Sequence, residues 1–357
     1  MMLYKLLSGM DRERFSPSVI SLQDKGTIGS LIEQLGVPVH ALEMRRGIPT
    51  PRVVLSLFYL LRRLDPHVIQ GWMYHGNLAA SLGALACRRP ICWNIRQSLY
   101  SLTYEKRATA LVIRIGALLS GMTSCIVYNA HESLRHHEGV GYHGRSVVIP
   151  NGFDTERFRP DADPSVRAEL GIPAGSPLIG LVARYHPMKD HENFLRAAAL
   201  LYNQNPHVHF LLAGKGVDGD NTDLSAMIRN LNLCGHVHLL GERTDVPRIT
   251  AALDMATLSS YAEAFPNVVG EAMVSGVPCV VTDVGDSAWI VGGTGRVVPP
   301  RDSGALADAW LDLIEMGNEG RRELGRRARQ RICENFSLDE VVRQYENLYE
   351  QLAAKKG

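Results

Sequence analysis

Strand-like and helix-like hydrophobic patterns alternate along nearly the whole of this chain of 357 residues. Short apolar runs have the length of buried strands, and most of the stretches between them repeat apolar residues at the spacing of one helix face. Strands joined through helices pair in parallel by right-handed crossovers, so the pattern predicts a doubly wound α/β protein. We expect strands at 18–22, 37–42, 67–71, 91–95, 125–128, 146–149, 178–183, 208–213, 237–240, 256–258, 279–282 and 295–298.

The length of the chain suits two domains. Pro150-Asn151-Gly152 separates two runs of the alternation, so we expect domains at 1–149 and 150–337. Residues 154–177 read as a linker with little core, because Pro, Asp, Arg and Gly are frequent there. An amphipathic helix is expected at the start of the chain, marked by Leu3, Leu6, Leu7 and Met10.

Composition excludes several classes of protein. The chain has 38 Lys and Arg against 37 Asp and Glu, so its net charge gives no case for nucleic acid as a partner. Its six cysteines form no C-x-x-C pair, which argues against a zinc site and fits reduced thiols in a reducing compartment. No stretch has the apolarity of a membrane span, and the start lacks the long apolar core of a signal peptide.

The stretch YAEAFPNVVGEAMVSGVPCVVTD is the strongest candidate for a functional site. Phe265, Pro266 and Asn267 lie between an expected strand and an expected helix, where Pro commonly begins a helix. Such a helix start directs free backbone N–H groups at a ligand above the sheet, which suits a phosphate. Glu263 in the loop and Glu271 one turn inside the helix could accept hydrogen bonds from sugar or ribose hydroxyls. An acidic loop followed by an ordinary helix explains the same spacing equally well.

Two cations follow the expected strand at 178–183. Arg184 ends that strand, and Lys189 stands just before the next helix. The carboxyl ends of parallel strands are where such sheets bind ligands. There Arg can hold phosphate oxygens with two hydrogen bonds, while Lys supplies a mobile point charge. Taken singly, either residue could be a solvated surface cation.

Residues 214–219 match the pattern G-x-G-x-x-G after a strand. A dinucleotide site also needs a helix packed closely on the third glycine. Here Gly219 is followed by polar residues that read as a loop before a late helix cap. We therefore expect Gly214 and Gly216 to form a Gly-rich turn beside a ligand, and we expect no nicotinamide site.

The first half of the chain offers fewer polar candidates. His75 and Arg96 each follow an expected strand, and a hydrogen-bonded loop histidine and a surface arginine explain them as well. The chain has no G-x-S-x-G, H-E-x-x-H or Cys/His pairing, so a hydrolase triad or a zinc protease has no support. Two D-x-D pairs, at 161–163 and 218–220, lie in turn-rich sequence that favours solvated loops over a metal site.

Together these motifs resemble glycosyltransferase family 4, whose members are retaining, sugar-nucleotide-dependent enzymes of the GT-B fold. VIPNGFDTERFRP looks like the family's interdomain segment, ARYHPMK like its diphosphate clamp, and FLLAGKG and GERTDV like its nucleotide-side loops. The most specific match is AEAFPNVVGEAMVSGVPCVVTD, which looks like its E-x7-E segment. The resemblance implies two Rossmann-like domains facing across a cleft, with a final helix at 338–357 that joins the N-terminal domain.

The resemblance also implies roles for single residues. Arg184 and Lys189 would neutralise the donor diphosphate, Glu263 would contact the donor sugar, and Glu271 the ribose. Preorganised cations and helix N–H groups stabilise a departing diphosphate, so neither a metal ion nor another cofactor is expected. Same-face attack would give retention without a protein nucleophile. The other donor-binding residues would be Gly214, Gly216, Phe265, Pro266, Asn267, Val268 and Arg243.

The N-terminal half departs from the family in two respects. Many members carry a His where this chain has Arg96, so His75 and Arg96 are candidates for the acceptor side without a transferable role. Members also begin with a strand and a Gly-rich loop before the first helix, and this chain lacks both. We therefore expect the N-terminal sheet to be one strand short. Either the true start of the protein lies upstream of Met1, or this chain is impaired.

The leading hypothesis is a cytoplasmic enzyme that moves a sugar from a nucleoside-diphosphate sugar to a glycan or lipid-linked acceptor, in surface polysaccharide biosynthesis. The alternatives are a catalytically impaired sugar-nucleotide-binding protein and a sugar-nucleotide epimerase of the same fold. Peripheral membrane contact is a further option, although a core-facing helix with solvated ends explains the same pattern. Five arginines flank the apolar residues 53–61: Arg45, Arg46, Arg52, Arg62 and Arg63.

Overall fold

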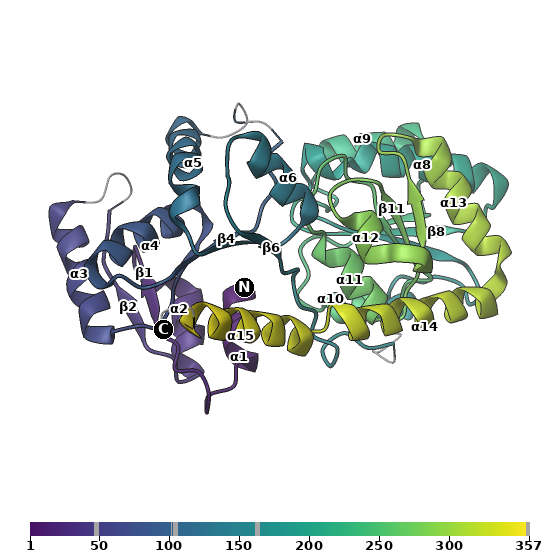
Figure 1. The fold of residues 1–357 in the computed structure, drawn as a ribbon. Helices are drawn as coiled ribbons and strands as arrows, with labels where there is room; N and C mark the ends of the chain where they lie inside the picture. The colour runs from purple at the N-terminus through teal and green to yellow at the C-terminus, as the bar shows by residue number, and fades with distance from the viewer. Residues whose placement is uncertain (46–49, 101, 103–105, 161–164, 355–357) are drawn as a thin grey trace. The chain divides into compact units, whose positions relative to one another are not determined.

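The computed structural model describes residues 1–45, 50–100, 102, 106–160 and 165–354. The chain forms two compact units, one of Met1–Gly152 with Leu338–Gly357 and one of Phe153–Ser337 (Figure 1). The first unit thus combines two distant parts of the sequence. Every strand pairing among the described residues is parallel, which confirms the doubly wound α/β prediction.

The first unit contains a four-stranded sheet of order β3-β4-β5-β6 and a separate two-stranded sheet, β1-β2. The expected strands are present with ends that differ by one or two residues. In chain order the elements are α1 (Met2–Gly9), β1 (Val19–Ser21), α2 (Gly26–Gln34), β2 (Val39–Ala41), α3 (Pro51–Leu64), β3 (Ile69–Trp72), α4 (Met73–Cys87), β4 (Ile91–Ile95), α5 (Arg107–Leu119), η2 (Ser120–Met122), β5 (Cys125–Tyr128), α6 (His131–Gly139), β6 (Ser146–Val148) and α15 (Leu338–Ala354).

The four-stranded sheet is buried on both faces. Alternate residues of its strands point to opposite sides of the sheet, and each side packs against its own set of helices. Trp93 and Ile95 of β4 belong to one apolar cluster, which the inner faces of α3, α4 and α5 complete. Cys92 of β4 and Val127 of β5 belong to another, which α1 and α15 complete. Helices α3, α4 and α5 therefore form one layer, and the paired α1 and α15 cover the opposite face (Figure 1).

The second unit holds a six-stranded sheet of order β12-β11-β10-β7-β8-β9. Its elements are α7 (Ser165–Glu169), β7 (Leu178–Val182), η3 (Pro187–Lys189), α8 (His191–Gln204), β8 (His209–Ala213), α9 (Thr222–Asn230), β9 (Val237–Leu239), α10 (Val246–Ala251), β10 (Met255–Leu258), α11 (Asn267–Val274), β11 (Cys279–Thr282), α12 (Ser287–Val291), η4 (Gly292–Thr294), β12 (Arg296–Val298), α13 (Ser303–Glu315) and α14 (Gly317–Asn335).

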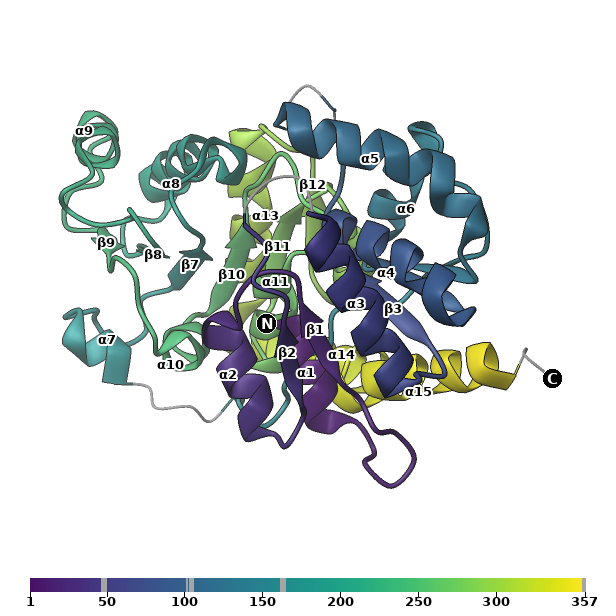
Figure 2. The same ribbon diagram turned by 90° about the vertical axis from the view of Figure 1, so that its left-hand side faces the viewer.

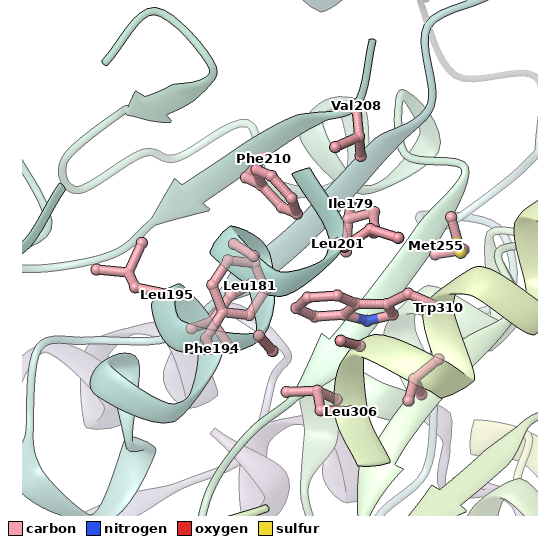
Figure 3. Close-up of a cluster of buried hydrophobic side chains, with 14 of the residues drawn as sticks. Ile179, Leu181, Phe194, Leu195, Leu201, Val208, Phe210, Met255, Leu306 and Trp310 are labelled. Carbon is pink, nitrogen blue, oxygen red and sulfur yellow. The ribbon is translucent and has the colours of Figure 1, made fainter. Parts of the chain in front are cut away.

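Trp310 of α13 is at the centre of the main core of this unit (Figure 3). Its ring lies 5.1 Å from the ring of Phe194 in α8 and 5.9 Å from that of Phe210 in β8. The indole N–H is satisfied as well, since it donates to Thr257 Oγ1 at 3.0 Å. Large aromatic side chains that bury their area and pair their polar atom stabilise a core strongly, so this cluster holds the sheet and two helices together.

The expectation of a coreless linker at 154–177 is wrong in part. The described residues of this segment include α7, and Phe158, Val166 and Ile172 are buried. Their apolar side chains are separated by polar residues, so the segment shows no periodic pattern, yet each side chain reaches the body of the unit. The pair Asp161 and Asp163 lies outside the described residues. Among the described helices, none combines the length and apolarity that crossing a bilayer requires.

Candidate functional site

The carboxyl ends of β7 and β10 form the focus of the site. The chain leaves β7 toward β8 and β9, then returns to the other side of β7 to form β10. This reversal creates a topological switch point, and open parallel sheets bind ligands just beyond the carboxyl ends of the two strands there. Arg184 and Lys189 follow β7, and Glu263 follows β10, so the topology brings the three candidates to one edge of the sheet.

Lys189 and Glu263 meet directly at this switch point. Lys189 Nζ forms an ion pair with Glu263 Oε1, and Ser260 Oγ donates a hydrogen bond of 2.8 Å to the same carboxylate oxygen. The two charged side chains are only 23% and 14% exposed, respectively. Partial burial strengthens the attraction relative to a fully solvated pair, so the carboxylate holds the ammonium group at the edge of the sheet.

Two hydrogen bonds to backbone carbonyls join the loops that carry this pair. Ser259 Oγ donates to the Lys189 carbonyl at 2.7 Å, and the Tyr261 amide donates to the Met188 carbonyl at 3.0 Å. Sequence reasoning did not single out Ser259 and Ser260. Their position directly after β10 was the available signal, because it matches that of Arg184 after β7.

The turn that presents Lys189 is capped at both ends. The Met188 amide donates to His186 Nδ1 at 3.2 Å. Asp190 adopts a left-handed conformation with φ of 50°, and its side chain accepts from the Asn193 amide at 3.2 Å to begin α8. Arg184 lies beside this turn with an exposed side chain, and no hydrogen bond or ion pair holds it within the described residues. The turn therefore fixes Lys189 while Arg184 stays available.

Helix α11 begins where the sequence predicted, immediately after Pro266. Buried Phe265 anchors this helix start, because its ring packs 6.0 Å from Phe153 and 6.1 Å from Phe336. Gly270 allows the same contact: a Cβ there would lie 2.0 Å from Phe153 Cζ. Asn267 is exposed at the first helical position, so the start of α11 is accessible at the surface of the unit.

Glu271 lies one turn into α11, in a different setting from Glu263. It lines a small hollow between α10, α11 and the sheet, together with Val268, Thr250 and Val246. The free space in this hollow is about 10 Å³, close to that of a single water molecule, and its lining includes two threonines beside the apolar side chains and the carboxylate. Glu271 and Val268 thus occupy one hollow, whereas Glu263 belongs to the Lys189 pair.

The Gly-rich turn after β8 requires its first glycine. Gly214 has a φ of 151°, and a Cβ there would lie 2.2 Å from the Ala183 carbonyl oxygen. The turn is bound to its neighbours, since the Tyr185 amide donates to the Lys215 carbonyl at 2.8 Å. Gly216 follows with a φ of 72°. The predicted loop and late cap are confirmed, because Asn221 Oδ1 accepts from the Leu224 amide at 3.1 Å to begin α9.

Arg243 is engaged within its own loop. Its Nε and Nη2 donate to the two carboxylate oxygens of Asp245 at 2.7 and 2.6 Å. This fork, with Arg248 donating to the same carboxylate at 3.1 Å, lowers the pKa of Asp245 well below its usual range. The D-x-D pair at 218–220 lies in a turn, where the Asp220 amide donates to Asp218 Oδ1. Among the described residues, no three His, Cys, Asp or Glu side chains gather as a metal site.

The two N-terminal candidates differ in their surroundings. His75 is exposed in the first turn of α4. Arg96 binds three partners inside the first unit: Asn94 Oδ1 at 3.3 Å, the Tyr345 hydroxyl at 2.9 Å, and Asn151 Oδ1. Arg96 thereby ties β4 to α15 and to the end of the first unit, a role that local sequence gave no reason to expect.

Known proteins resemble both halves of the chain. The family model "Glycosyltransferase Family 4" matches residues 1–157, and "Glycosyl transferases group 1" matches residues 176–316. N-acetyl-alpha-D-glucosaminyl L-malate synthase of Bacillus anthracis is 28% identical over 65% of this chain and 59% of its own length. D-inositol 3-phosphate glycosyltransferase of Nocardia farcinica is 32% identical over 52% of this chain and 43% of its own length. The matched region thus spans about half the length of these curated relatives.

Solved structures show the same fold. HepE of Anabaena, crystallised in complex with UDP, has a TM-score of 0.84 at 23% identity, covering 98% of this chain and 95% of that one. Sucrose-phosphate synthase of Thermosynechococcus elongatus has a TM-score of 0.78 at 20% identity, covering 98% and 92%. Matched in its first half by one family model and in its second half by the other, the chain belongs to glycosyltransferase family 4 and has the GT-B fold of two Rossmann-like domains.

Proposed function

We propose that this protein is a retaining glycosyltransferase that moves a sugar from a nucleoside-diphosphate sugar to a glycan or lipid-linked acceptor. The observation that carries the proposal is the ion pair between Lys189 and Glu263 at the switch point between β7 and β10. Arg184 follows the same strand, β7, five positions before Lys189, and its side chain is exposed. A site with two cations and one carboxylate matches a ligand that has both a diphosphate and sugar hydroxyls.

The charges act on the leaving group. When the bond between sugar and diphosphate breaks, negative charge grows on the phosphate oxygens, and fixed cations and N–H groups stabilise it more in the transition state than in the ground state. Lys189 would bind the diphosphate with Arg184, and backbone N–H groups at the start of α11 would donate hydrogen bonds to the distal phosphate. These groups supply the positive charge themselves, so the proposal needs no metal ion or other cofactor.

The carboxylates would orient the rest of the donor. Glu263, held in place by Ser260, would accept hydrogen bonds from the donor sugar. Glu271 would do so from the ribose, with Val268 of the same helix beside the nucleoside. Retention would follow from attack on the same face of the sugar, with the departing phosphate taking the proton of the acceptor.

Uridine donors are the first to test, because HepE of Anabaena was crystallised with UDP and with UDP-glucose. The proposal places the protein in the cytoplasm, which its six free cysteines support. It also places the protein in surface polysaccharide biosynthesis, where lipid-linked acceptors would bring it to the inner face of the membrane.

Calorimetry tests donor binding directly. UDP, GDP, UDP-glucose and GDP-mannose are titrated into the full chain in the presence of EDTA, after circular dichroism has shown that the sample is folded. We expect one nucleoside diphosphate, UDP or GDP, and the corresponding nucleoside-diphosphate sugar to bind. If no uridine or guanosine diphosphate sugar binds the folded protein, the proposal fails, and binding restored only by Mg²⁺ rejects metal independence.

One structural feature favours a second candidate, a sugar-nucleotide-binding protein with impaired catalysis. The strand pairs of the first unit form two separate sheets, β1-β2 and β3-β6, among the described residues. A sheet interrupted in this way could position an acceptor poorly. Donor binding without transfer to any acceptor or to water would favour this candidate. An epimerase would instead convert the sugar nucleotide alone, and product from donor without acceptor identifies it.

A further inference from the structure

The outer face of the helix layer in the first unit is unusually apolar. Nine of the fifteen large apolar side chains that are exposed among the described residues lie between positions 55 and 122. They sit mainly on α3, α4 and α5, and α4 contacts both neighbours, so that it lies between them (Figure 2). These helices pack their inner sides on one face of the β3-β6 sheet, and their outer sides therefore look the same way.

Helix α5 has the clearest arrangement. The residues of α5 that are buried against the core are Ile113, Gly116 and Ala117. The opposite side carries Leu111, Ile115 and Leu118 at the spacing of a helix face, and Leu118 is 81% exposed. Met122, in the following η2, is exposed as well. Three bulky side chains of α5 thus point outward, whereas Ile113 is the one bulky residue among the three that are buried. Burial within this unit does not account for that distribution.

The neighbouring helices extend this apolar face. On α3, Leu57 and Leu61 are buried, but Leu55 and Tyr59 are about two-thirds exposed. On α4, Leu85 is 69% exposed. Helix α3 therefore faces the core with one side, has solvated ends as expected, and exposes apolar residues on a second side as well. Exposed large apolar side chains gathered on neighbouring helices of one layer are typical of an interaction surface.

Positive charge surrounds the same face. Residues 44–131 contain eleven Lys and Arg but only Asp65 and Glu105 as acids, in a chain with a formal net charge of +1. None of α3, α4 and α5 contains an Asp or Glu. The exposed cations on or beside the three helices are Arg52, Arg62, Arg63, Arg88, Lys106, Arg107 and Arg114. Global charge balance conceals this local excess.

We infer that the outer face of α3, α4 and α5 docks on an anionic lipid bilayer. Leu111, Leu118 and Met122 would enter the boundary between headgroups and acyl chains, and the flanking arginines would bind lipid phosphates. A second copy of this chain is a poorer occupant, because a symmetric contact would bring the two sets of arginines together. The inference rests on the first unit alone and does not depend on the proposed transferase activity.

Vesicle flotation tests the inference. The full chain is mixed with phosphatidylcholine vesicles containing about one-third phosphatidylglycerol, and separately with pure phosphatidylcholine vesicles. Wild-type protein is expected to float with the anionic vesicles only, and less at high salt. Leu111→Ser with Leu118→Ser, and separately Arg107→Gln with Arg114→Gln, are each expected to lower the vesicle-bound fraction about tenfold.

Matched controls come from the second unit. Leu200→Ser removes an exposed apolar side chain of α8, and Arg322→Gln with Arg327→Gln removes two exposed charges of α14. These controls are expected to float like wild type. Protein that stays unbound with anionic vesicles, or Leu variants that bind as well as the controls, would overturn the inference. If sedimentation showed a dimer that the Leu variants abolish, the inference would be overturned in favour of self-association. If the protein bound nucleic acid in a salt-sensitive way but did not bind vesicles, it would be overturned in favour of nucleic acid as the partner.

Discussion

Lys189 and Glu263 form an ion pair between the loops that follow β7 and β10, although 74 positions separate them in the sequence. The pair places a partly buried ammonium group at the switch point of the second sheet, with the carboxylate fixed by Ser260. A bound diphosphate would compete with Glu263 for Lys189. The two residues therefore respond differently to mutation, and that difference makes the proposed function testable at single side chains.

Replacing Lys189 should weaken nucleotide binding. Lys189→Ala removes a charged hydrogen-bond donor to the diphosphate, a loss of about 1.5–3 kcal/mol or roughly 10- to 100-fold in affinity. Calorimetric titration with UDP measures the change. Arg322→Ala, which removes an exposed cation elsewhere in the same unit, is the control and should bind as wild type does. Unchanged UDP affinity in Lys189→Ala would remove this lysine from the proposed site.

Replacing Glu263 should separate binding from turnover. Glu263→Gln keeps the size of the side chain but frees Lys189 from its ion pair. We expect UDP affinity to be unchanged or higher, while sugar transfer falls about 100-fold because a contact to the reacting sugar is lost. Parallel titration and product assay measure both quantities. A matching loss of UDP affinity would mean that Glu263 orders the site without contacting the sugar.

Arg96 and His75 should differ in their effect on stability. Arg96→Ala leaves Asn94 and the Tyr345 hydroxyl without their charged partner inside the first unit, at a cost of about 1.5–3 kcal/mol. His75→Ala removes an exposed side chain and should change the free energy of unfolding by less than about 0.5 kcal/mol. Urea unfolding followed by circular dichroism compares the two. Equal stability of both variants would contradict the structural role given to Arg96.

Mild acid should destabilise the second unit. Burial lowers the pKa of His191 to about 4, and burial together with His238 and His236 lowers the pKa of His209 to about 4. The folded state keeps both imidazoles neutral, so their contribution to stability is complete above the ordinary pKa of 6.5 and is lost as pH falls toward 4. For His191 this amounts to about 2 kcal/mol between about pH 7.5 and pH 5.

A histidine variant checks that assignment. His191→Gln removes the titrating group and should reduce the loss of unfolding free energy between those two pH values by about 2 kcal/mol. His207→Gln, at an exposed position, should keep the wild-type dependence. If His191→Gln were as acid-sensitive as wild type, other groups would be responsible.

The glycine inside α11 should tolerate no side chain. In Gly270→Ala the added Cβ would lie 2.0 Å from Phe153 Cζ, so the aromatic cluster that anchors the helix start must shift. We expect a loss of about 1–3 kcal/mol in stability and weaker UDP binding. Gly219→Ala is the control, because a Cβ there meets nothing within 4 Å. Thermal unfolding and titration measure the two effects, and a Gly270→Ala protein as stable as the control would contradict this packing.

Periodicity predicted the elements well but did not predict which side of a helix is buried. The strands at 91–95 and 125–128 begin and end where the patterns indicated, because a run of apolar residues is a local property. Helix α5 shows the limit. Its residues are apolar on two sides, and periodicity cannot distinguish the small buried set around Gly116 from the large exposed set around Leu118.

The sequence by itself determined the alternation of strands and helices, and it placed Arg184, Lys189 and Glu263 just beyond strand ends. Only the tertiary structure decided which strand ends are neighbours. Strand order depends on how whole layers pack, which no local pattern encodes, and it brings Lys189 to Glu263. The same holds for Arg96, whose partner Tyr345 is 249 positions away on α15. Because a charged side chain takes its partners from the groups that surround it, the contacts of these residues were decided by packing between distant segments.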